Sequence, residues 1–211
     1  MPENKKMTFL KKGWIYIAAL IFLFVQTYPL FWIFMTSFKS ELEISEGNTV
    51  ALPKQWVLEN YIKTFEKVDV SRYFINSFVI TGAALILICL LSSTAAFAIR
   101  KMDYKITKYL KVFFIAGIMV PVHIALIPMF IIYQRIGLLN TYLGIILLHV
   151  GFALPMSIYM FHAFYRYIPD SVLESAVMDG CGIYRMFVSI VVPMSKNTFA
   201  TVITMNFMFI W

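Results

Sequence analysis

Long apolar segments without charge alternate with short charged segments along this chain. Asp, Glu, Lys and Arg are absent from four runs, 13–38, 73–99, 112–134 and 136–165. Each run exceeds the ~20 residues that an α-helix needs to cross about 30 Å of hydrocarbon. A helix is the open-chain solution in lipid, because lipid offers no partner for an unpaired N–H or C=O. The pattern therefore predicts an all-α fold, a polytopic transmembrane helical bundle.

The apolar runs also predict how the chain is divided. We expect a basic tail over 1–13 and one transmembrane domain over 14–211, with spans at about 14–38, 73–99, 112–134 and 142–165. A fifth apolar run, 197–211, is short for a span. We therefore expect the sequence to end inside a fifth transmembrane helix, as in a truncated or incompletely built protein. The first span is too long for the apolar region of a cleavable signal peptide.

Composition excludes a soluble domain. Apolar residues make up 61% of the chain and charged residues 14%, whereas soluble domains average about 45–50% and ~25%. Gly and Pro recur inside the spans, which favours a packed and kinked bundle over isolated anchors. The two cysteines, Cys89 and Cys181, fall in a span and in a polar segment, and they have no metal-ligand spacing.

Basic residues are distributed unevenly between the two sides that these spans define. One side carries Lys5, Lys6, Lys11, Lys12, Arg100, Lys101, Lys105, Lys108, Lys111, Arg166, Arg185 and Lys196. The other side carries Lys39, Lys54, Lys63, Lys67, Arg72 and Arg135, mostly in a loop that also holds six acids. The positive-inside rule then places the N-terminus in the cytoplasm. The net charge of +7 reflects this topology and attraction to anionic lipid, and it is not evidence for nucleic-acid binding.

A polar insert, 169–193, separates the fourth and fifth apolar runs and should lie on the cytoplasmic membrane surface. Ser171 and Glu174 have the spacing of a capping box, which predicts a helix over about 172–179. Gly180 would end that helix in the left-handed conformation, and Asp179 would cap the next helix. On these features alone, a surface linker with ordinary caps is an equally good interpretation.

A second helix should follow the turn. It begins at about Ile183 and has apolar residues at helical spacing, Met186, Phe187, Ile190 and Val191. Pro193 should bend the chain before the fifth span. The insert is therefore expected to be a helix–turn–helix parallel to the membrane, with one apolar and one polar face.

The insert resembles the EAA loop of the membrane subunits of ATP-binding cassette (ABC) importers, E-A-A-x-x-x-G-x(9)-I-x-L-P. The residues that match it in register are Glu174, Ala176, Gly180, Ile190 and Pro193. Ser175 replaces the middle Ala and Val192 replaces Leu, while Asp179 and Phe187 match the form common among carbohydrate importers. Further segments look like maltose-type permeases, at 29–40, 52–65, 72–81, 95–104 and 127–147. Members of that family normally continue through a complete fifth span and a sixth.

The resemblance implies a type I ABC importer permease fold with a cytoplasmic EAA coupling helix. The chain would then be the permease subunit of a sugar importer in a bacterial inner membrane, forming half of the translocation path. The expected partners are a second homologous permease subunit, two cytoplasmic ATPase subunits, an extracytoplasmic solute-binding protein and the lipid bilayer. The sequence has no G-x-x-x-x-G-K-[ST] motif, so we expect no cofactor on this chain, with ATP bound by the partner ATPase. The residues expected to contact the ATPase are Glu174, Ser175, Ala176, Asp179, Gly180, Ile190 and Pro193.

Polar residues inside the spans have two interpretations. His123, between Pro121 and Pro128, should face the bundle because a polar ring is costly on the lipid face. It could line a sugar path or form a helix–helix hydrogen bond, and the same choice applies to Asn76. An ion-coupled secondary transporter or channel would need membrane-embedded carboxylates to carry cations, and the spans contain none. A membrane-embedded enzyme would need clustered His, Asp or Glu, and only Glu174 and Asp179 come near that description.

Overall fold

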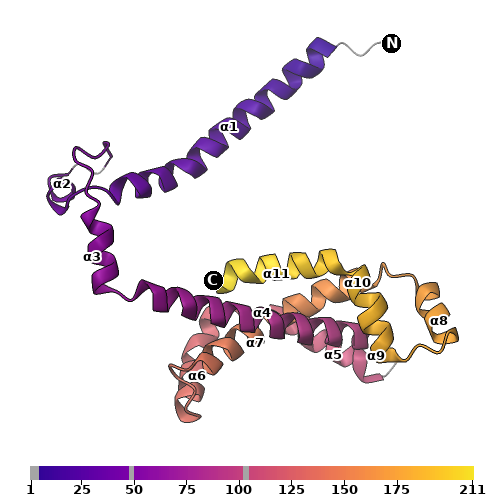
Figure 1. Cartoon of the computed structure of the whole chain (residues 1–211). Helices are drawn as coiled ribbons and strands as arrows, with labels where there is room; N and C mark the ends of the chain where they lie inside the picture. Colours follow the sequence, from indigo (N-terminus) through magenta and orange to yellow (C-terminus); the bar gives the residue numbers. More distant parts are fainter. Residues whose placement is uncertain (1–4, 48–49, 102–104) are drawn as a thin grey trace. The chain divides into compact units, whose positions relative to one another are not determined.

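The computed structural model describes residues 5–47, 50–101 and 105–211, and all regular secondary structure in these ranges is helical (Figure 1). The chain separates into two compact units, Met1–Ser71 and Arg72–Trp211. Three helical stretches are long and apolar enough to cross a membrane: Gly13–Thr36, Val70–Lys101 and Tyr142–Tyr165. Two bent pairs of shorter helices also qualify if each pair counts as one span.

The first unit contains α1 (Lys5–Thr36), α2 (Glu41–Ser45) and α3 (Glu59–Lys67). The helix α1 begins inside the predicted basic tail rather than after it. From Trp14 to Phe34 its side chains are apolar except for Gln26 and Thr27, and almost all are exposed. A helix that is apolar on all sides must be covered by lipid or by other helices.

The segment after α1 is held by side-chain contacts to its backbone. Asn60 Nδ2 donates to the carbonyls of Ser37 and Lys39, at 2.9 and 2.8 Å. Glu43 accepts a hydrogen bond from the backbone N–H of Lys54 at 2.9 Å. The helix α3 therefore belongs to an ordered segment that is held to the end of α1.

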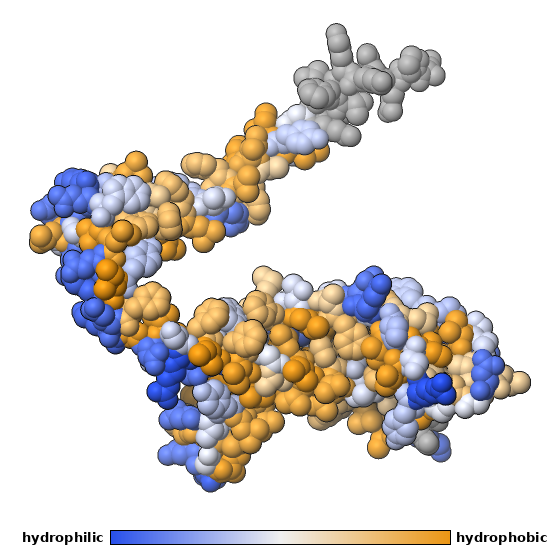
Figure 2. Space-filling model, in the orientation of Figure 1, coloured by the Kyte–Doolittle hydropathy of each residue, from blue (hydrophilic) through white to orange (hydrophobic). Residues whose placement is uncertain are grey.

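The second unit is built on α4 (Val70–Lys101), α5 (Lys105–Ile118), α6 (Val122–Arg135), α7 (Tyr142–Tyr165) and α11 (Lys196–Ile210). Its buried core includes Ala84, Ile88, Ala96, Phe97, Val150, Ile158, Phe161, Tyr165 and Val202. Small side chains on α4 allow neighbouring helices to approach closely. Buried Ser92 bonds the carbonyl of Ile88 in its own helix, which fits a packing role. The space-filling view shows hydrophobic side chains across the visible surface of these helices (Figure 2).

The predicted third span, 112–134, is not one continuous helix. It is divided between α5 and α6, whose axes differ by 101° across a break at residues 119–121. Pro121 explains the break, because it lacks an N–H and forces the residue before it out of the helical region. His123 consequently lies in the first turn of α6 and is exposed, instead of at the centre of a straight span.

Candidate functional site

The polar insert folds as a helical hairpin between α7 and α11, which we call the 170–194 hairpin. It contains α8 (Asp170–Met178), α9 (Ile183–Met186), a π-helical turn (Phe187–Val191) and α10 (Val192–Met194) (Figure 1). The helix–turn–helix architecture is the one that the sequence predicts. All the residues matched to the EAA pattern lie within it.

Gly180 is the turn residue of this hairpin. Its φ is +76°, and its N–H bonds the carbonyl of Val177 at 2.9 Å. The N–H of Cys181 bonds the carbonyl of Ala176, also at 2.9 Å. These two bonds and the left-handed residue make a Schellman motif, which satisfies the last carbonyls of α8. A Cβ built on Gly180 would meet no atom within 4 Å, so the chain itself leaves open space there.

Two predictions about the caps are wrong. The helix α8 begins at Asp170, after Pro169, so Ser171 lies inside the first turn and makes no capping bond. Pro169 accounts for the earlier start. Its backbone is extended and not helical, so the helix begins at the next residue, Asp170. Asp179 does not cap α9 either: the residue before α9 is Gly182, and no side chain caps that helix. Asp179 is instead the C-cap of α8.

The hairpin has an inner face against the bundle and an outer exposed face. Leu173, Ala176 and Met186 are buried in the core. The ring of Phe187 lies 5.2 Å, centroid to centroid, from that of Phe97 on α4.

The outer face contains both polar and large apolar side chains. Glu174, Ser175 and Asp179 are exposed. Met178 and Tyr184 are each 87% exposed, and Val177 is 59% exposed. These three apolar side chains flank the Gly180 turn on both sides. A polar surface element that exposes such side chains together is a candidate protein-docking surface.

The end of the hairpin is shaped by Pro193. A proline at this position removes one backbone donor, and the turn before it widens into the π-helical segment that contains half-buried Ile190. Ser195, fully buried, then donates to the carbonyl of Val191 at 2.5 Å. The axis of Ile183–Met194 meets that of α11 at 74°. The predicted bend before the fifth apolar helix is therefore present, centred on Ser195 rather than Pro193.

A charged contact links the hairpin to α4. The Asp170 carboxylate accepts a hydrogen bond from the Lys101 ammonium, and Arg100 Nη2 lies 3.8 Å from its other oxygen. The hydrogen bond and the charge of Lys101 lower the pKa of Asp170, with a smaller contribution from Arg100. This contact was not predicted, because nothing in the sequence indicates that residues 101 and 170 are neighbours.

A hollow of about 620 Å³ lies between the end of α4 and the hairpin. Lys101 and Asp170 contribute to its wall, together with Glu174, Val177, Met178 and Met186. Apolar and acidic side chains of the hairpin therefore line the same concave surface.

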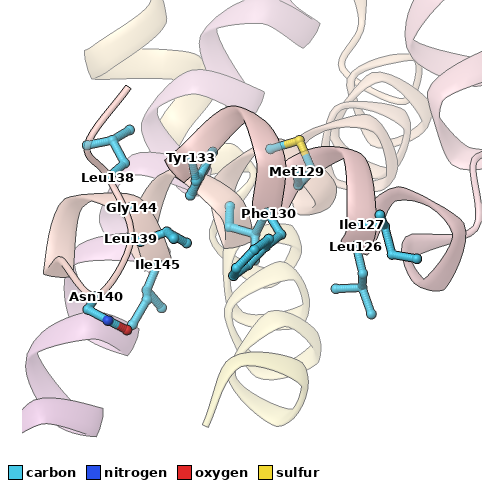
Figure 3. A pocket seen from close by; sticks show the side chains of 11 residues that line it. Leu126, Ile127, Met129, Phe130, Tyr133, Leu138, Leu139, Asn140, Gly144 and Ile145 are labelled. Atoms are coloured by element: carbon cyan, nitrogen blue, oxygen red, sulfur yellow. The ribbon is translucent and has the colours of Figure 1, made fainter. Parts of the chain in front are cut away.

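The two span residues predicted for a substrate path lie on different helices, His123 on α6 and Asn76 on α4. Asn76 on α4 accepts a hydrogen bond from the hydroxyl of Tyr142 on α7 at 2.6 Å. A separate, mostly apolar hollow of about 520 Å³ lies between α6 and the start of α7, lined by residues that include Phe130, Tyr133 and Asn140 (Figure 3). Neither His123 nor Asn76 lines it.

Known proteins with similar sequences or structures place the chain in a family. Residues 88–211 match the family model described as "Binding-protein-dependent transport system inner membrane component". The diacetylchitobiose uptake system permease protein NgcG of Streptomyces coelicolor is 36% identical over 87% of this chain and 60% of its own length. A putative ABC transporter permease protein of a Caldicellulosiruptor species is 32% identical over 97% of this chain and 75% of its length.

The solved structure of a bacterial ABC transporter that imports alginate matches the whole chain and 73% of its own chain. The TM-score is 0.76 at 20% identity, which is similarity of fold. This chain spans less than two thirds of the length of the Streptomyces relative. Its family model, its relatives and its helical fold agree: the chain belongs to the inner-membrane components of binding-protein-dependent transport systems, with the all-α type I permease fold of ABC importers.

Proposed function

We propose that this chain is the transmembrane permease subunit of an ATP-driven sugar importer and forms half of the translocation path. Family membership supports this proposal, as do the names of relatives that import diacetylchitobiose, starch degradation products and melibiose with raffinose and stachyose. None of these relatives supports the alternative of an ion-coupled secondary transporter or channel.

The observation that carries the proposal is the exposed face of the 170–194 hairpin. Val177, Met178 and Tyr184 present apolar surface to water around a left-handed glycine whose Cβ direction is open. Burial of such side chains in a partner's groove would be favourable by about 25 cal/mol per Å². A groove on a cytoplasmic ATPase subunit is the partner surface that the family implies.

The complex would contain a second homologous permease subunit, two ATPase subunits and an extracytoplasmic solute-binding protein. The excess of Lys and Arg on one side supports a cytoplasmic N-terminus and a cytoplasmic hairpin in a bacterial cell. ATP would be bound by the ATPase subunits, and this chain would perform no chemistry on the sugar.

Coupling would be mechanical. Closure of the ATPase pair around ATP would move the hairpin, with Glu174 and Gly180 near the contact. Leu173, Ala176 and Met186 would pass that movement to the bundle because they are buried in its core. The spans would then shift between inward-open and outward-open states.

A matched pair of glycine variants tests the proposal. Gly180 and Gly137 both have positive φ, +76° and +72°, and both have open space at the Cβ position. Gly180→Arg and Gly137→Arg therefore introduce similar backbone strain, but only Gly180→Arg projects a side chain into the proposed contact. We expect Gly180→Arg to abolish co-purification of a Walker-motif ATPase and uptake of labelled oligosaccharides, while Gly137→Arg retains both. Equal behaviour of the two variants in the full-length protein would refute the proposed contact.

A further inference from the structure

A second hollow, of about 360 Å³, lies where α4 ends, α5 begins and α7 ends. Arg100, Lys108, Lys111 and Arg166 line it, with Thr107 and His162 completing the polar wall. Four permanent cations from three helices thus surround one small concave space. The hairpin mechanism does not use this space.

Among the residues that the structure describes, the cations of this hollow have a single acidic partner. In the ranges 50–101 and 105–211, the only ion pair formed by a lining residue joins Arg100 to Asp170, at 3.8 Å. Arg100 Nε is buried and has no hydrogen-bond partner in the same ranges. A buried donor without an acceptor costs free energy, and like charges gathered in one place repel. An anion in the hollow would relieve both.

Apolar surface continues from the hollow along α5 and α7. The seam between these two helices shares Ile99, Lys111 and His162 with the hollow, and it is nearly closed, with a free volume of about 10 Å³. Ile115 and Tyr159 beside the seam are exposed on the outside of the two helices. The helix α7 is long and apolar enough to cross a membrane, and α5 qualifies together with α6 as a bent pair. The basic hollow therefore lies at the boundary where headgroups meet acyl chains, with apolar surface on its lipid side.

We infer that this hollow binds the phosphate headgroup of an anionic phospholipid, with an acyl chain against the exposed apolar surface of α5 and α7 around Ile115 and Tyr159. Basic pockets between transmembrane helices suit such headgroups, and Arg binds phosphate oxygens in bidentate geometry. A free phosphate would use the cations but not the exposed apolar surface beside them. An acidic protein surface would have to enter a hollow that opens beside lipid-facing helices. The inference requires only that the chain is inserted in a membrane and is independent of the sugar or the ATPase.

The test measures lipid retention by the full-length protein purified in mild detergent with its accompanying subunits. The protein is delipidated and incubated with vesicles of phosphatidylcholine alone or mixed with phosphatidylglycerol, and bound lipid is counted by native mass spectrometry. Lys108→Gln/Lys111→Gln removes two charges from the hollow. Lys105→Gln/Lys196→Gln removes two charges from exposed positions outside it.

We expect the wild type to retain phosphatidylglycerol in preference to phosphatidylcholine. Lys108→Gln/Lys111→Gln loses two headgroup contacts, which should reduce lipid retention by about 30-fold. Lys105→Gln/Lys196→Gln should reduce lipid retention by less than about threefold, because water and salt screen the attraction of these exposed charges for the lipid. Lys108→Arg/Lys111→Arg, which keeps the charges, should retain the lipid and shows that the hollow folds with other side chains at these positions.

Three results would overturn the inference. Equal losses in the two Gln pairs would mean that net charge alone attracts the lipid. Displacement of bound lipid by inorganic phosphate would mean that the acyl chain contributes nothing. Loss of an accompanying subunit from Lys108→Gln/Lys111→Gln with unchanged lipid retention would assign the hollow to a protein partner.

Discussion

The carboxylate of Asp170, the first residue of α8, accepts a hydrogen bond from the ammonium of Lys101, the last residue of α4. The 170–194 hairpin is thereby connected to the end of a transmembrane helix far away in the sequence. Phe187 and Phe97 make a second contact between the same two parts. Movement of the hairpin would therefore be transmitted to α4 through one polar contact and one apolar contact.

The Asp170–Lys101 pair predicts a pH dependence at the start of α8. Lys101 lowers the pKa of Asp170, so the folded protein binds a proton there less readily than the unfolded chain. The stabilisation is complete above the ordinary Asp value of about 3.9 and is lost as the pH falls through the lowered pKa. We expect the protection of α8 amides, measured relative to their intrinsic exchange rate at each pH, to fall below that value, and Asp170→Asn to show low protection already at neutral pH.

A control separates this pair from exposed ion pairs in general. Glu59 and Lys63 form an exposed pair on α3, at 3.1 Å. Glu59→Gln should leave the protection of α8 unchanged. High salt should weaken that protection in the wild type and in Glu59→Gln, but not in Asp170→Asn. Identical exchange in Asp170→Asn and the wild type would show that the contact does not hold α8.

The exposed apolar face of the hairpin predicts a difference between two tyrosines. Tyr184 lies on α9 beside the Gly180 turn and is 87% exposed, and Tyr167 precedes the hairpin and is 82% exposed. If the face docks on an ATPase, Tyr184→Ser should weaken binding, because a buried aromatic at an interface typically contributes about 2 kcal/mol or more. Tyr167→Ser should not. The ATPase affinity of the purified membrane subunit measures this directly, and equal affinities would contradict docking through Tyr184.

Sequence patterns anticipated the features of this fold that depend on local chemistry. Charge-free runs marked the helices, and Gly180 was identified as a left-handed turn because few other residues tolerate positive φ. One wrong cap arose where neighbouring residues competed for one role: Pro169, Asp170 and Ser171 all favour a helix start, and the extended conformation of Pro169 sets it at Asp170. The other arose because Gly182, and not Asp179, directly precedes α9.

Long-range features were beyond the reach of sequence patterns. The break between α5 and α6 was missed because the apolar run through Pro121 is continuous and a proline can also be accommodated by a kink. The contacts of Asp170 with Lys101 and of Asn76 with Tyr142 join residues far apart in the chain. The spacing of residues along the sequence carries no information about such pairs. A polar residue in a span could therefore be recognised from the sequence, but its partner could not.

A buried polar contact between α7 and α11 predicts a measurable coupling. Asn206 Nδ2 donates to Ser157 Oγ at 3.1 Å and to the carbonyl of Val202 at 2.8 Å, and both side chains are buried. Hydrogen bonds between transmembrane helices average ~0.6 kcal/mol in double-mutant cycles. We expect Asn206→Ala and Ser157→Ala each to lower the unfolding free energy, with a coupling of about that size. Strict additivity of the two variants would show that the bond contributes nothing.

Two glycines of α7 should respond in opposite ways to alanine. A Cβ on Gly144 would fall inside contact distance of the Leu138 carbonyl oxygen and 3.1 Å from Thr141 Oγ1. That Thr141 oxygen also caps α7 by accepting from the Gly144 N–H at 3.0 Å. A backbone carbonyl cannot swing aside as a side-chain end can, so Gly144→Ala must move the loop before α7 and should cost about 1–3 kcal/mol.

Gly151 provides the matched control on the same helix, because a Cβ there meets nothing within 4 Å. Gly151→Ala should therefore raise stability by about 0.5–1 kcal/mol, since alanine loses less backbone entropy than glycine in a helix. Thermal unfolding of the purified protein in detergent measures both shifts under one condition. If both variants are destabilised alike, Gly151 is covered by a neighbour within the membrane, and if both are tolerated, the loop from Leu138 to Thr141 yields more easily than its hydrogen bonds indicate.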